Sequence, residues 1–359
     1  MKQLRFFIFI TLLFILLTAC ADSREYPRLN IIFFIGDGMG TAQMDAASIY
    51  KSGETGKLSF EDFPVSAAVT TFSADSAVTD SAAAATAMAT GAKVNNGVIS
   101  QAIPGDGSDL KTLLEFFRSY GLSTGLVTTA YITHATPAAF GAHTDSRNNT
   151  TEIALDYFTQ TKPNLLLGGG ANGVSRLLAE NNGYTVVTGR KELLSLNTAQ
   201  VIYLSGQFGA DHLPFQLDGL GTLPCLSEML QAALKFLGRN PNGFFLMVEG
   251  GRIDHACHAN DIQRMVFEMI EFDYTVQLAR NWVSTRNDTL IVVTADHETG
   301  GLSVVQNNGA GIMPTVSWTT TGHTAVDVKV FAMGAHADKL ATVEDNTDFY
   351  PILKDIYTN

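Results

Sequence analysis

The chain has 359 residues, a formal net charge of −12 and an apolar content of 46%. This length suits one large domain or two modest ones, and the apolar content is ample for a hydrophobic core. Because nucleic acid binding needs a basic footprint, the acidic balance argues against nucleic acid as a specific partner.

The first twenty residues are typical of a targeting segment. Lys2 and Arg5 give a small basic start, and the apolar stretch 6–17 is too short for a comfortable membrane span. It ends in Leu-Thr-Ala-Cys at 17–20, which resembles the lipobox of bacterial lipoproteins, where the chain is cut before a cysteine that then carries lipid.

We therefore expect a signal peptide at 1–19, lipid attached to Cys20 and a polar tether at 20–29. A lipid anchor of this kind places the protein in the cell envelope, periplasmic or surface, and bound to the membrane. The alternative is an ordinary secretory signal with an accidental cysteine. Cys225 and Cys257 remain, and whether they pair is left open.

Apolar runs alternate with amphipathic or alanine-rich stretches from residue 30 onwards. Short, continuously apolar runs are typical of parallel strands buried on both faces, and their alternation with helices indicates repeated βαβ units. We expect a single α/β domain over 30–359, with a mostly parallel central sheet and helices on both faces.

The predicted strands are 30–35, 126–129, 165–167, 244–248, 289–294 and 328–332. The predicted helices are 81–90, 110–120, 153–161, 226–237, 262–283 and 349–357. The glycine-rich stretches 168–170 and 307–311 are expected to be loops.

Carboxylate and imidazole side chains follow four of the predicted strands. Ligands gather at the carboxyl ends of parallel strands, and these side chains are the types that hold zinc. The sequence therefore predicts a metal site at one edge of the sheet. Its candidate ligands are Asp37, Thr136, Glu249, Asp254, His258, Asp296 and His297, with His323 in a polar loop further on; His134 and His255 are expected near the site rather than among the ligands.

Two pairs of these ligands have a spacing that bears on how they can reach an ion. Asp254 and His258 are four residues apart, so they share one face if the segment is helical. His255 lies between them and then points elsewhere. Asp296 and His297 are adjacent and need an irregular turn to reach one ion; the glycines at 300 and 301 supply the flexibility.

Ser81 is the candidate nucleophile. Asp80 is a natural N-cap for the alanine-rich helix that ends at Gly91, which puts Ser81 in the first turn. A helix N-terminus presents free N–H groups to an anion, so a serine there can attack phosphorus while the same groups hold the product. An Asp-Ser pair alone is usually a simple cap; beside several metal ligands it becomes a catalytic candidate.

Five short motifs together resemble the alkaline phosphatase family. They occur in that family's order, they cover the chain from about Asn30 to Gly334, and the ordered set is much more specific than any one of them. The motifs are Gly-Asp-Gly-Met-Gly at 36–40, Asp-Ser-Ala-Ala at 80–83, the stretch 248–258 with Glu249, Asp254 and His258, Thr-Ala-Asp-His at 294–297, and Gly-His-Thr at 322–324.

The resemblance implies a role for each site residue. One zinc ion would be held by Asp254, His258 and His323, and a second by Asp37, Asp296 and His297. A third ion, magnesium, would be held by Asp37, Thr136 and Glu249. Ser81 would attack small phosphomonoester substrates and form a phosphoserine, and Arg147 would clamp two phosphate oxygens, which suits its planar guanidinium.

Two histidines stand where members of this family differ. His134 and His255 occupy positions at which some bacterial members carry aspartate and lysine. Because imidazole suits zinc or cobalt better than hydrated magnesium, the third ion stays open among these metals. A neutral His255 would also hold phosphate less tightly than lysine. The segment between His297 and His323 is short where many relatives insert a subdomain used in subunit contacts, so a homodimer is possible and unsettled.

Three alternative functions follow from the same residues. A phosphodiesterase or a sulfatase of the same superfamily would keep the metal cradle, and a metal-binding surface lipoprotein would have lost catalysis. Ser81 and Arg147 argue against the last, because a metal binder needs neither. His143, His212 and His336 are assigned no function, and His212 is expected in a structural turn.

Overall fold

The structure is a computed structural model that describes residues 28–358. The predicted signal peptide, Cys20 and nearly all of the predicted tether lie outside these residues. Leu29 already belongs to the first strand, so the tether ends earlier than predicted. Within the described part of the chain, no helix is both long and apolar enough to cross a membrane.

A nine-stranded sheet forms the centre of the molecule, in the order β2-β13-β8-β1-β7-β3-β4-β6-β5. All neighbours from β8 to β5 are parallel, and β13 is antiparallel to both β8 and β2. The predicted mostly parallel α/β fold is thus confirmed. The strands are β1 (Leu29–Gly36), β2 (Val65–Val69), β3 (Ser123–Tyr131), β4 (Leu165–Gly169), β5 (Tyr184–Val187), β6 (Tyr203–Phe208), β7 (Gly243–Gly250), β8 (Thr289–Ala295) and β13 (Val328–Gly334).

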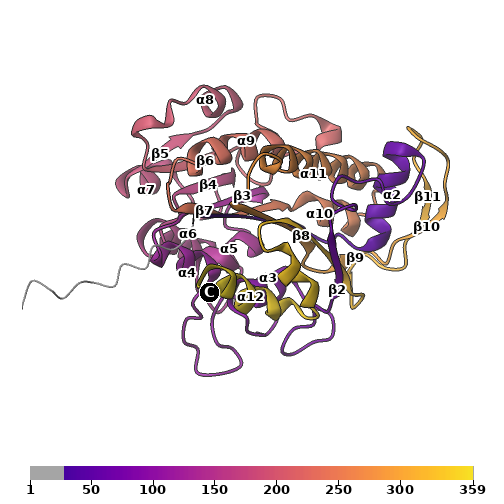
Figure 1. Cartoon of the computed structure of the whole chain (residues 1–359), viewed down its shortest axis with the longest axis horizontal. Helices are drawn as coiled ribbons and strands as arrows, with labels where there is room; N and C mark the ends of the chain where they lie inside the picture. The colour runs from indigo at the N-terminus through magenta and orange to yellow at the C-terminus, as the bar shows by residue number, and fades with distance from the viewer. Residues whose placement is uncertain (1–27, 359) are drawn as a thin grey trace, which may run out of the picture.

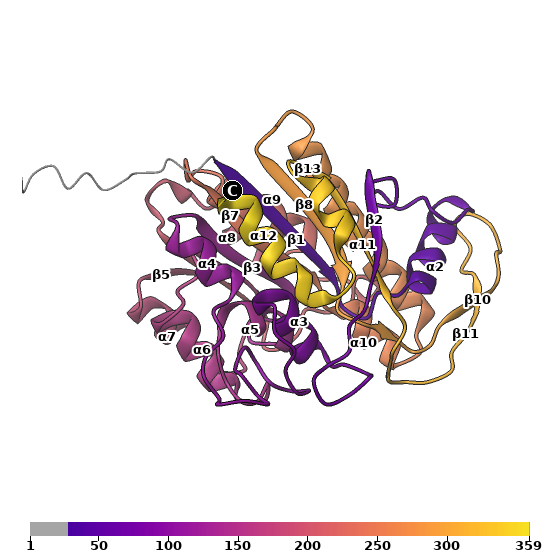
Figure 2. The ribbon, with the colours of Figure 1, turned by 60° about the horizontal axis from the view of Figure 1, so that its bottom comes forward.

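Helices cover both faces of this sheet (Figure 1). On one face lie α9 (Leu226–Leu237) and α11 (Ile262–Val283), which pack on the central strands. On the other face lie α3 (Ser81–Thr90), α4 (Leu113–Ser119), α5 (Ala135–Gly141), α6 (Thr150–Thr159) and α12 (Phe349–Thr358). Figure 2 shows α12 crossing in front of the sheet, where the Phe349 ring meets the Phe33 ring of β1 edge-on at 5.2 Å.

β1 lies between β7 and β8 and is buried along its whole length. Ile31 to Ile35 are fully buried, because helices cover both faces of the strand. A residue at either face must therefore be apolar, which explains the uninterrupted apolar run. The strand ends at Gly36, level with Gly250 of β7 and Ala295 of β8, so three strands stop at one edge.

α3 packs on all sides, since each of its ten residues is buried. Its small alanine side chains allow this close approach. The helix begins after Asp80, whose carboxylate accepts the N–H of Ala83, and ends at Gly91 with φ of 76°. Both ends agree with the prediction.

Several short elements were not predicted. They are α2 (Thr41–Ser52), α7 (Arg176–Asn181), α8 (Arg190–Ser195), the strands β2, β5 and β6, and the pairs β9 (Glu298–Thr299) with β12 (His323–Thr324) and β10 (Ser303–Gln306) with β11 (Thr315–Ser317). The segment from His297 to His323 therefore contains the antiparallel strand pair β10–β11, which lies beside α2, and is not a plain loop (Figure 1).

Two further expectations are wrong. Gly168 and Gly169 belong to β4 rather than to a loop, and a Cβ at Gly169 would collide with the backbone oxygen of Asp211. Glycine is thus required there by close packing inside the strand. The predicted helix at 110–120 begins only at Leu113, because Thr112 and Glu115 form a capping box.

Candidate metal centre

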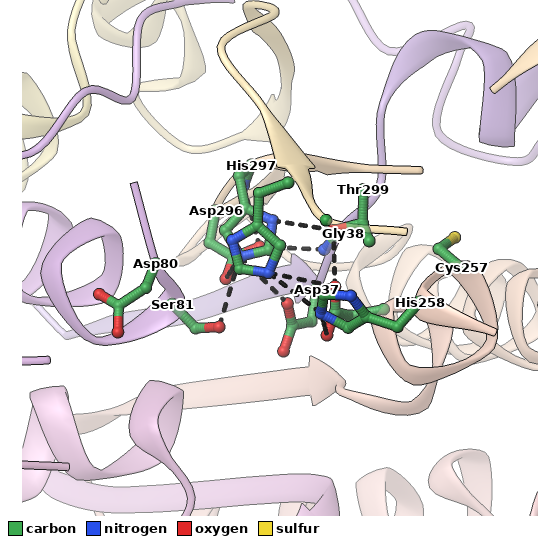
Figure 3. A network of polar contacts seen from close by, with 12 residues as sticks. Asp37, Gly38, Asp80, Ser81, Cys257, His258, Asp296, His297 and Thr299 are labelled. Atoms are coloured by element: carbon green, nitrogen blue, oxygen red, sulfur yellow. Dashed lines mark hydrogen bonds and ion pairs between the residues drawn. The ribbon is translucent and has the colours of Figure 1, made fainter. Parts of the chain in front are cut away.

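The carboxyl ends of four parallel strands deliver the predicted ligands. Asp37 follows β1, Asp296 and His297 follow β8, and Glu249 lies at the end of β7. A short helix after β7, α10 (Arg252–His258), carries Asp254 and His258, and α5 after β3 begins next to His134 and contains Thr136. Figure 3 shows Asp37 and Asp296 between Ser81 on one side and His258 on the other.

Asp37, Asp296 and His297 form one group that could hold a metal ion. Nε2 of His297 lies 3.2 Å from Oδ2 of Asp296 and 3.7 Å from Oδ1 of Asp37, and all three side chains are fully buried. Thr299 fixes the His297 ring. Its hydroxyl donates to Oδ1 of Asp254 at 2.6 Å and so must accept from Nδ1–H of His297 at 3.2 Å. The lone pair of His297 Nε2 therefore faces the carboxylates.

Asp254, His258 and His323 are the second set of predicted ligands, and their side chains lie close together. Nε2 of His258 lies 3.2 Å from Oδ2 of Asp254 and 3.2 Å from Nε2 of His323, and His323 Nε2 lies 3.7 Å from Oδ1 of Asp254. Both histidines donate Nδ1–H to backbone oxygens, those of Thr321 and Thr79, and present Nε2 to the site. The predicted i, i+4 pair does share one helical face.

His297 borders both groups. Its ring stacks on that of His323 at 3.6 Å. The possible metal-binding group at this position consists of Asp254, His323 and His297, with His297 where the prediction has His258. His323 lies in the two-residue strand β12, paired with β9, and not in a loop as predicted. This pairing brings residues 323 and 299 together beside the end of β8.

Asp37, His134 and Glu249 form a third group. His134 thus joins the possible ligands themselves, whereas the sequence placed it only nearby. Thr136 Oγ1 is buried in the same place, and Thr128 donates a hydrogen bond to Glu249. Asp37 is shared by the first and third groups.

Buried polar atoms without partners converge on these groups. Among the described residues, no hydrogen bond reaches either carboxylate oxygen of Asp37, Oδ2 of Asp296, Oε1 of Glu249, Oγ1 of Thr136 or Nδ1 of His134. A buried carboxylate without a partner is costly, and a divalent cation satisfies several such oxygens at once. The residues therefore fit the metals that the resemblance implies.

The pKa values reflect the same crowding. Burial, followed by the charges of Asp296, Asp254 and Glu249, raises the pKa of Asp37 well above its ordinary value. Burial also raises the pKa of Glu249 to about 7. The hydrogen bond to Asp254 raises the pKa of His258 to about 9. A cation would displace these protons, because metal ligands must be deprotonated.

Ser81 and Arg147 lie at the rim of the metal groups. Ser81 Oγ is 3.3 Å from Nε2 of His297, and Ser81 is only 2% exposed (Figure 3). Arg147 donates from Nη1 to Oδ2 of Asp80 at 2.9 Å, and its Nη2 lies 3.3 Å from Nε2 of His134. The guanidinium of Arg147 thus lies between Asp80, the residue before Ser81, and His134 of the third group.

His255 and His212 form a cluster that sequence reasoning only half found. As expected for a helix, His255 points away from Asp254 and His258. Its ring lies 4.4 Å from that of His212 and 5.6 Å from that of His134. The sequence predicts a structural turn at His212 and assigns it no function. The signal that could identify it is its place just after β6, a parallel strand that the sequence analysis does not predict.

The remaining histidines and cysteines lie away from this centre or have no ligand role. His143 pairs with Glu115 at 3.2 Å, and His336 is exposed. Cys225 and Cys257, the two cysteines among the described residues, are free thiols, so no disulfide joins them.

Comparisons with known proteins give one consistent result. The sequence profile of the alkaline phosphatase family matches residues 28–176 and 167–315. Alkaline phosphatase 3 of Bacillus subtilis is 41% identical over 292 residues, which is 77% of this chain and 62% of the relative. The chain thus spans less than two thirds of that relative's length.

Solved structures are similar over almost the whole described chain. The cold-active alkaline phosphatase of a Shewanella species superposes with a TM-score of 0.84 and 31% identity, covering 92% of this chain and all of that one. A histidine-to-aspartate variant of the alkaline phosphatase of the bacterium TAB5, with magnesium bound in its M3 site, has a TM-score of 0.82 and 28% identity, covering 93% of this chain and 99% of that one.

Proposed function

The chain belongs to the alkaline phosphatase family, and from this premise we propose that it hydrolyses phosphate monoesters and releases inorganic phosphate. The observation that carries the proposal is the position of Ser81. Its hydroxyl lies beside His297, at the start of a buried helix. Three groups of possible metal ligands lie nearby, and Arg147, which could bind phosphate, pairs with the neighbouring Asp80.

We assign the ligands as the family resemblance implies. Asp254, His258 and His323 would hold one zinc ion, and Asp37, Asp296 and His297 a second. Asp37, Glu249 and Thr136 would hold the third ion, and we add His134 because its ring nitrogen lies in the same group. Bound ions would supply Lewis-acid activation of the attacking and leaving oxygens and would neutralise the buried carboxylates.

The third group combines oxygen donors with the imidazole of His134, and these two donor types favour different metals. Carboxylate and hydroxyl oxygens suit magnesium, whereas an imidazole favours zinc or cobalt. The TAB5 variant that holds magnesium in its M3 site carries an introduced carboxylate in place of a histidine. With His134 in the third group, we propose magnesium with zinc or cobalt as competitors for this site.

Ser81 performs the covalent chemistry. Ser81 Oγ forms a bond to phosphorus as the ester oxygen leaves with the substrate's alcohol, which takes up a proton. The resulting phosphoserine is cleaved by water, which returns the proton to Ser81 and releases phosphate. Two in-line displacements at phosphorus retain its configuration overall.

Positive groups converge on the phosphate oxygens during both steps. Asp80 already accepts the N–H of Ala83, while the N–H groups of Ser81 and Ala82 precede the first helical hydrogen bond and can face an anion. Arg147 can donate two parallel hydrogen bonds to phosphate, which suits a charge spread over three equatorial oxygens.

We also propose that the protein works outside the cytoplasm, anchored in the cell envelope through lipid on Cys20. The support is the Leu-Thr-Ala-Cys sequence after a short apolar stretch. Small phosphomonoesters are its proposed substrates, and a homodimer is compatible with the fold.

The deciding experiment combines metal analysis with phosphate release at alkaline pH. We expect p-nitrophenyl phosphate to be hydrolysed much faster than bis-p-nitrophenyl phosphate or p-nitrophenyl sulfate, activity to be lost on chelation, and zinc with magnesium to restore it. Faster turnover of the diester or the sulfate would identify a phosphodiesterase or a sulfatase. Metal binding with no turnover of any ester would identify a metal-binding lipoprotein.

A further inference from the structure

We propose that Arg252 is a positioning residue that fixes His255 as a hydrogen-bond donor to bound phosphate, and that the segment 209–219 holds both side chains in place. The role of His255 toward phosphate rests on the proposed function. The hold of Arg252 on His255 rests on contacts within the protein and can be measured without turnover.

The contact between Arg252 and His255 determines which ring nitrogen carries hydrogen. Nη1 of Arg252, the first residue of α10, lies 2.9 Å from Nδ1 of His255. A guanidinium has only N–H donors, so Nδ1 must accept and the ring hydrogen must be on Nε2. Nε2 has no hydrogen-bond partner among the described residues, which leaves its N–H available to a ligand.

Arg252 is itself held by packing rather than by an ion pair. Its guanidinium carbon lies 3.8 Å above the Phe215 ring, and its backbone N–H donates to Oγ1 of Thr129 at 3.2 Å. Its Nε is buried without a partner in the described chain. Stacking on an aromatic face favours a planar guanidinium in one orientation, which aims Nη1 at His255.

The segment 209–219 supplies both Phe215 and a wall beside His255. The His212 ring lies 4.4 Å from the His255 ring at 61°, and its Nδ1 accepts the backbone N–H of Tyr131 at 3.2 Å. The N–H of Gln216 donates to Oε1 of Glu268 in α11 at 2.8 Å. The segment is thus fixed at the end of β3 and on α11, and it limits rotation of His255.

A line of contacts connects His255 to the serine. The His255 ring lies 5.6 Å from that of His134, and Nε2 of His134 lies 3.3 Å from Nη2 of Arg147. Arg147 in turn binds Asp80, the residue before Ser81. A phosphate group held by Arg147 would therefore have His255 at its border, with the Nε2–H edge turned away from Arg252.

The test replaces the donor and uses a matched arginine as control. Arg252→Met keeps most of the side-chain volume but has no N–H, and Arg252→Lys keeps the charge without the planar group. Arg264 also lies over the Phe215 ring, at 5.0 Å, but pairs with Asp218 and Asp261 and does not contact His255. Arg264→Met is therefore the control for general disturbance of this segment.

The first readout is the tautomer of His255 in metal-loaded protein. Long-range ¹H–¹⁵N spectra of histidine-labelled protein, assigned with His255→Gln, distinguish Nε2–H from Nδ1–H. We expect the Nε2–H form in the wild type and in Arg264→Met, and a mixture or the Nδ1–H form in Arg252→Met. An unchanged tautomer in Arg252→Met overturns the proposal.

The second readout is the dissociation constant of inorganic phosphate, measured by calorimetry. We expect it to rise roughly three- to tenfold in Arg252→Met, less in Arg252→Lys, and not in Arg264→Met. An equal rise in Arg264→Met would show a merely structural effect and would overturn the proposal. If Arg252→Met fails to fold, Phe215→Leu removes the stacking surface and is judged by the same two readouts.

These readouts separate the two proposals. Phosphate binding and a tautomer that both depend on Arg252, in a protein that hydrolyses no monoester, would refute the proposed function while supporting the role of Arg252. If the protein hydrolyses monoesters but Arg252→Met changes neither readout, the proposed function is supported and the role of Arg252 is refuted.

Discussion

Ser81 Oγ and His297 Nε2 lie 3.3 Å apart although 216 residues separate them in the sequence. The end of β8 supplies the histidine, and the capped start of α3 supplies the serine. Thr299 holds the His297 ring so that its lone pair faces Asp37, Asp296 and the serine hydroxyl. The hydroxyl is therefore placed where a cation held by these residues would also contact it.

The Ser81→Ala variant tests this relationship directly. We expect kcat for p-nitrophenyl phosphate to fall on the order of 10³-fold or more, because the covalent intermediate can no longer form. Metal content and melting temperature should not change. Ser175→Ala, which removes an N-cap serine at the start of α7, is the control and should retain activity. Full activity in Ser81→Ala would remove Ser81 as the nucleophile.

Arg147→Ala tests the phosphate clamp. We expect KM for the monoester and the inhibition constant of phosphate to rise together, roughly ten- to hundredfold, since charge-assisted hydrogen bonds to phosphate are lost. Steady-state kinetics with phosphate as inhibitor measures both. Arg176→Ala, which removes an exposed arginine paired with Glu180, should change neither constant. A loss confined to protein stability would contradict the clamp.

Most of the long elements of this fold follow from the sequence, with the twelve-residue helix α2 as an exception. The bounds predicted for α9 and α11 agree with the structure, because both helices carry a regular apolar face and clear ends. β1, β7 and β8 were found because strands enclosed on both faces must be apolar throughout. Most of the ligands could be located for the same reason: they lie at or just after the ends of such strands, and parallel strands end at one edge. His323, which belongs to β12, is the exception.

The parts that were missed depend on packing between distant segments. β12 has two residues, and its pairing with β9 rather than its composition makes it a strand. Gly168 and Gly169 lie in a strand because β4 pairs with β6 there, and at Gly169 neighbouring backbone leaves no room for a Cβ. His212 reaches the site only because β6 joins the sheet beside β4. No local pattern carries this information.

Metal removal should make stability depend on pH. In the folded, metal-free protein, burial and the neighbouring carboxylates raise the pKa of Asp37. Burial raises the pKa of Glu249 to about 7. The folded state then binds protons more tightly than the unfolded chain, so stability is lost as the pH rises from about 4.5 to 7.

Melting curves from pH 5 to 9 on chelated and zinc-loaded protein measure this effect. We expect the melting temperature of the chelated protein to fall across this range, and zinc to restore it most strongly at the alkaline end. The Glu249→Gln variant should show a smaller fall when chelated. An equal pH profile with and without metal would contradict the assignment of these carboxylates.

Glu268 predicts a second, metal-independent effect of pH. This carboxyl group in α11 is buried, and burial raises its pKa to about 7 although it accepts the N–H of Gln216. Because the pKa is higher in the folded state, this group lowers the free energy of unfolding as the pH rises. The loss is absent below about pH 4.5 and complete above about pH 7. Glu268→Gln keeps the acceptor oxygen and removes the charge.

We therefore expect Glu268→Gln to raise the free energy of unfolding by up to about 3 kcal/mol at pH 8 and to change it little at pH 4.5. Urea denaturation at both pH values measures the difference. The exposed pair-forming residue Glu180 gives the control variant Glu180→Gln, which should be neutral at both. Destabilisation by Glu268→Gln at pH 8 would show that the charged form is favourable.

His255→Lys tests how tightly the product is held. Burial, followed by the charge interaction with His212, lowers the pKa of His255 to about 3. The His255 ring is therefore neutral at working pH. A lysine ammonium would add a charged donor, and such a bond is worth about 1 kcal/mol more than a neutral one, or about fivefold in affinity. We expect the inhibition constant of phosphate to fall by that factor and kcat to fall where product release limits turnover. His336→Lys, at an exposed position, is the control. Phosphate inhibition that stays the same in His255→Lys would mean that residue 255 does not border the bound product.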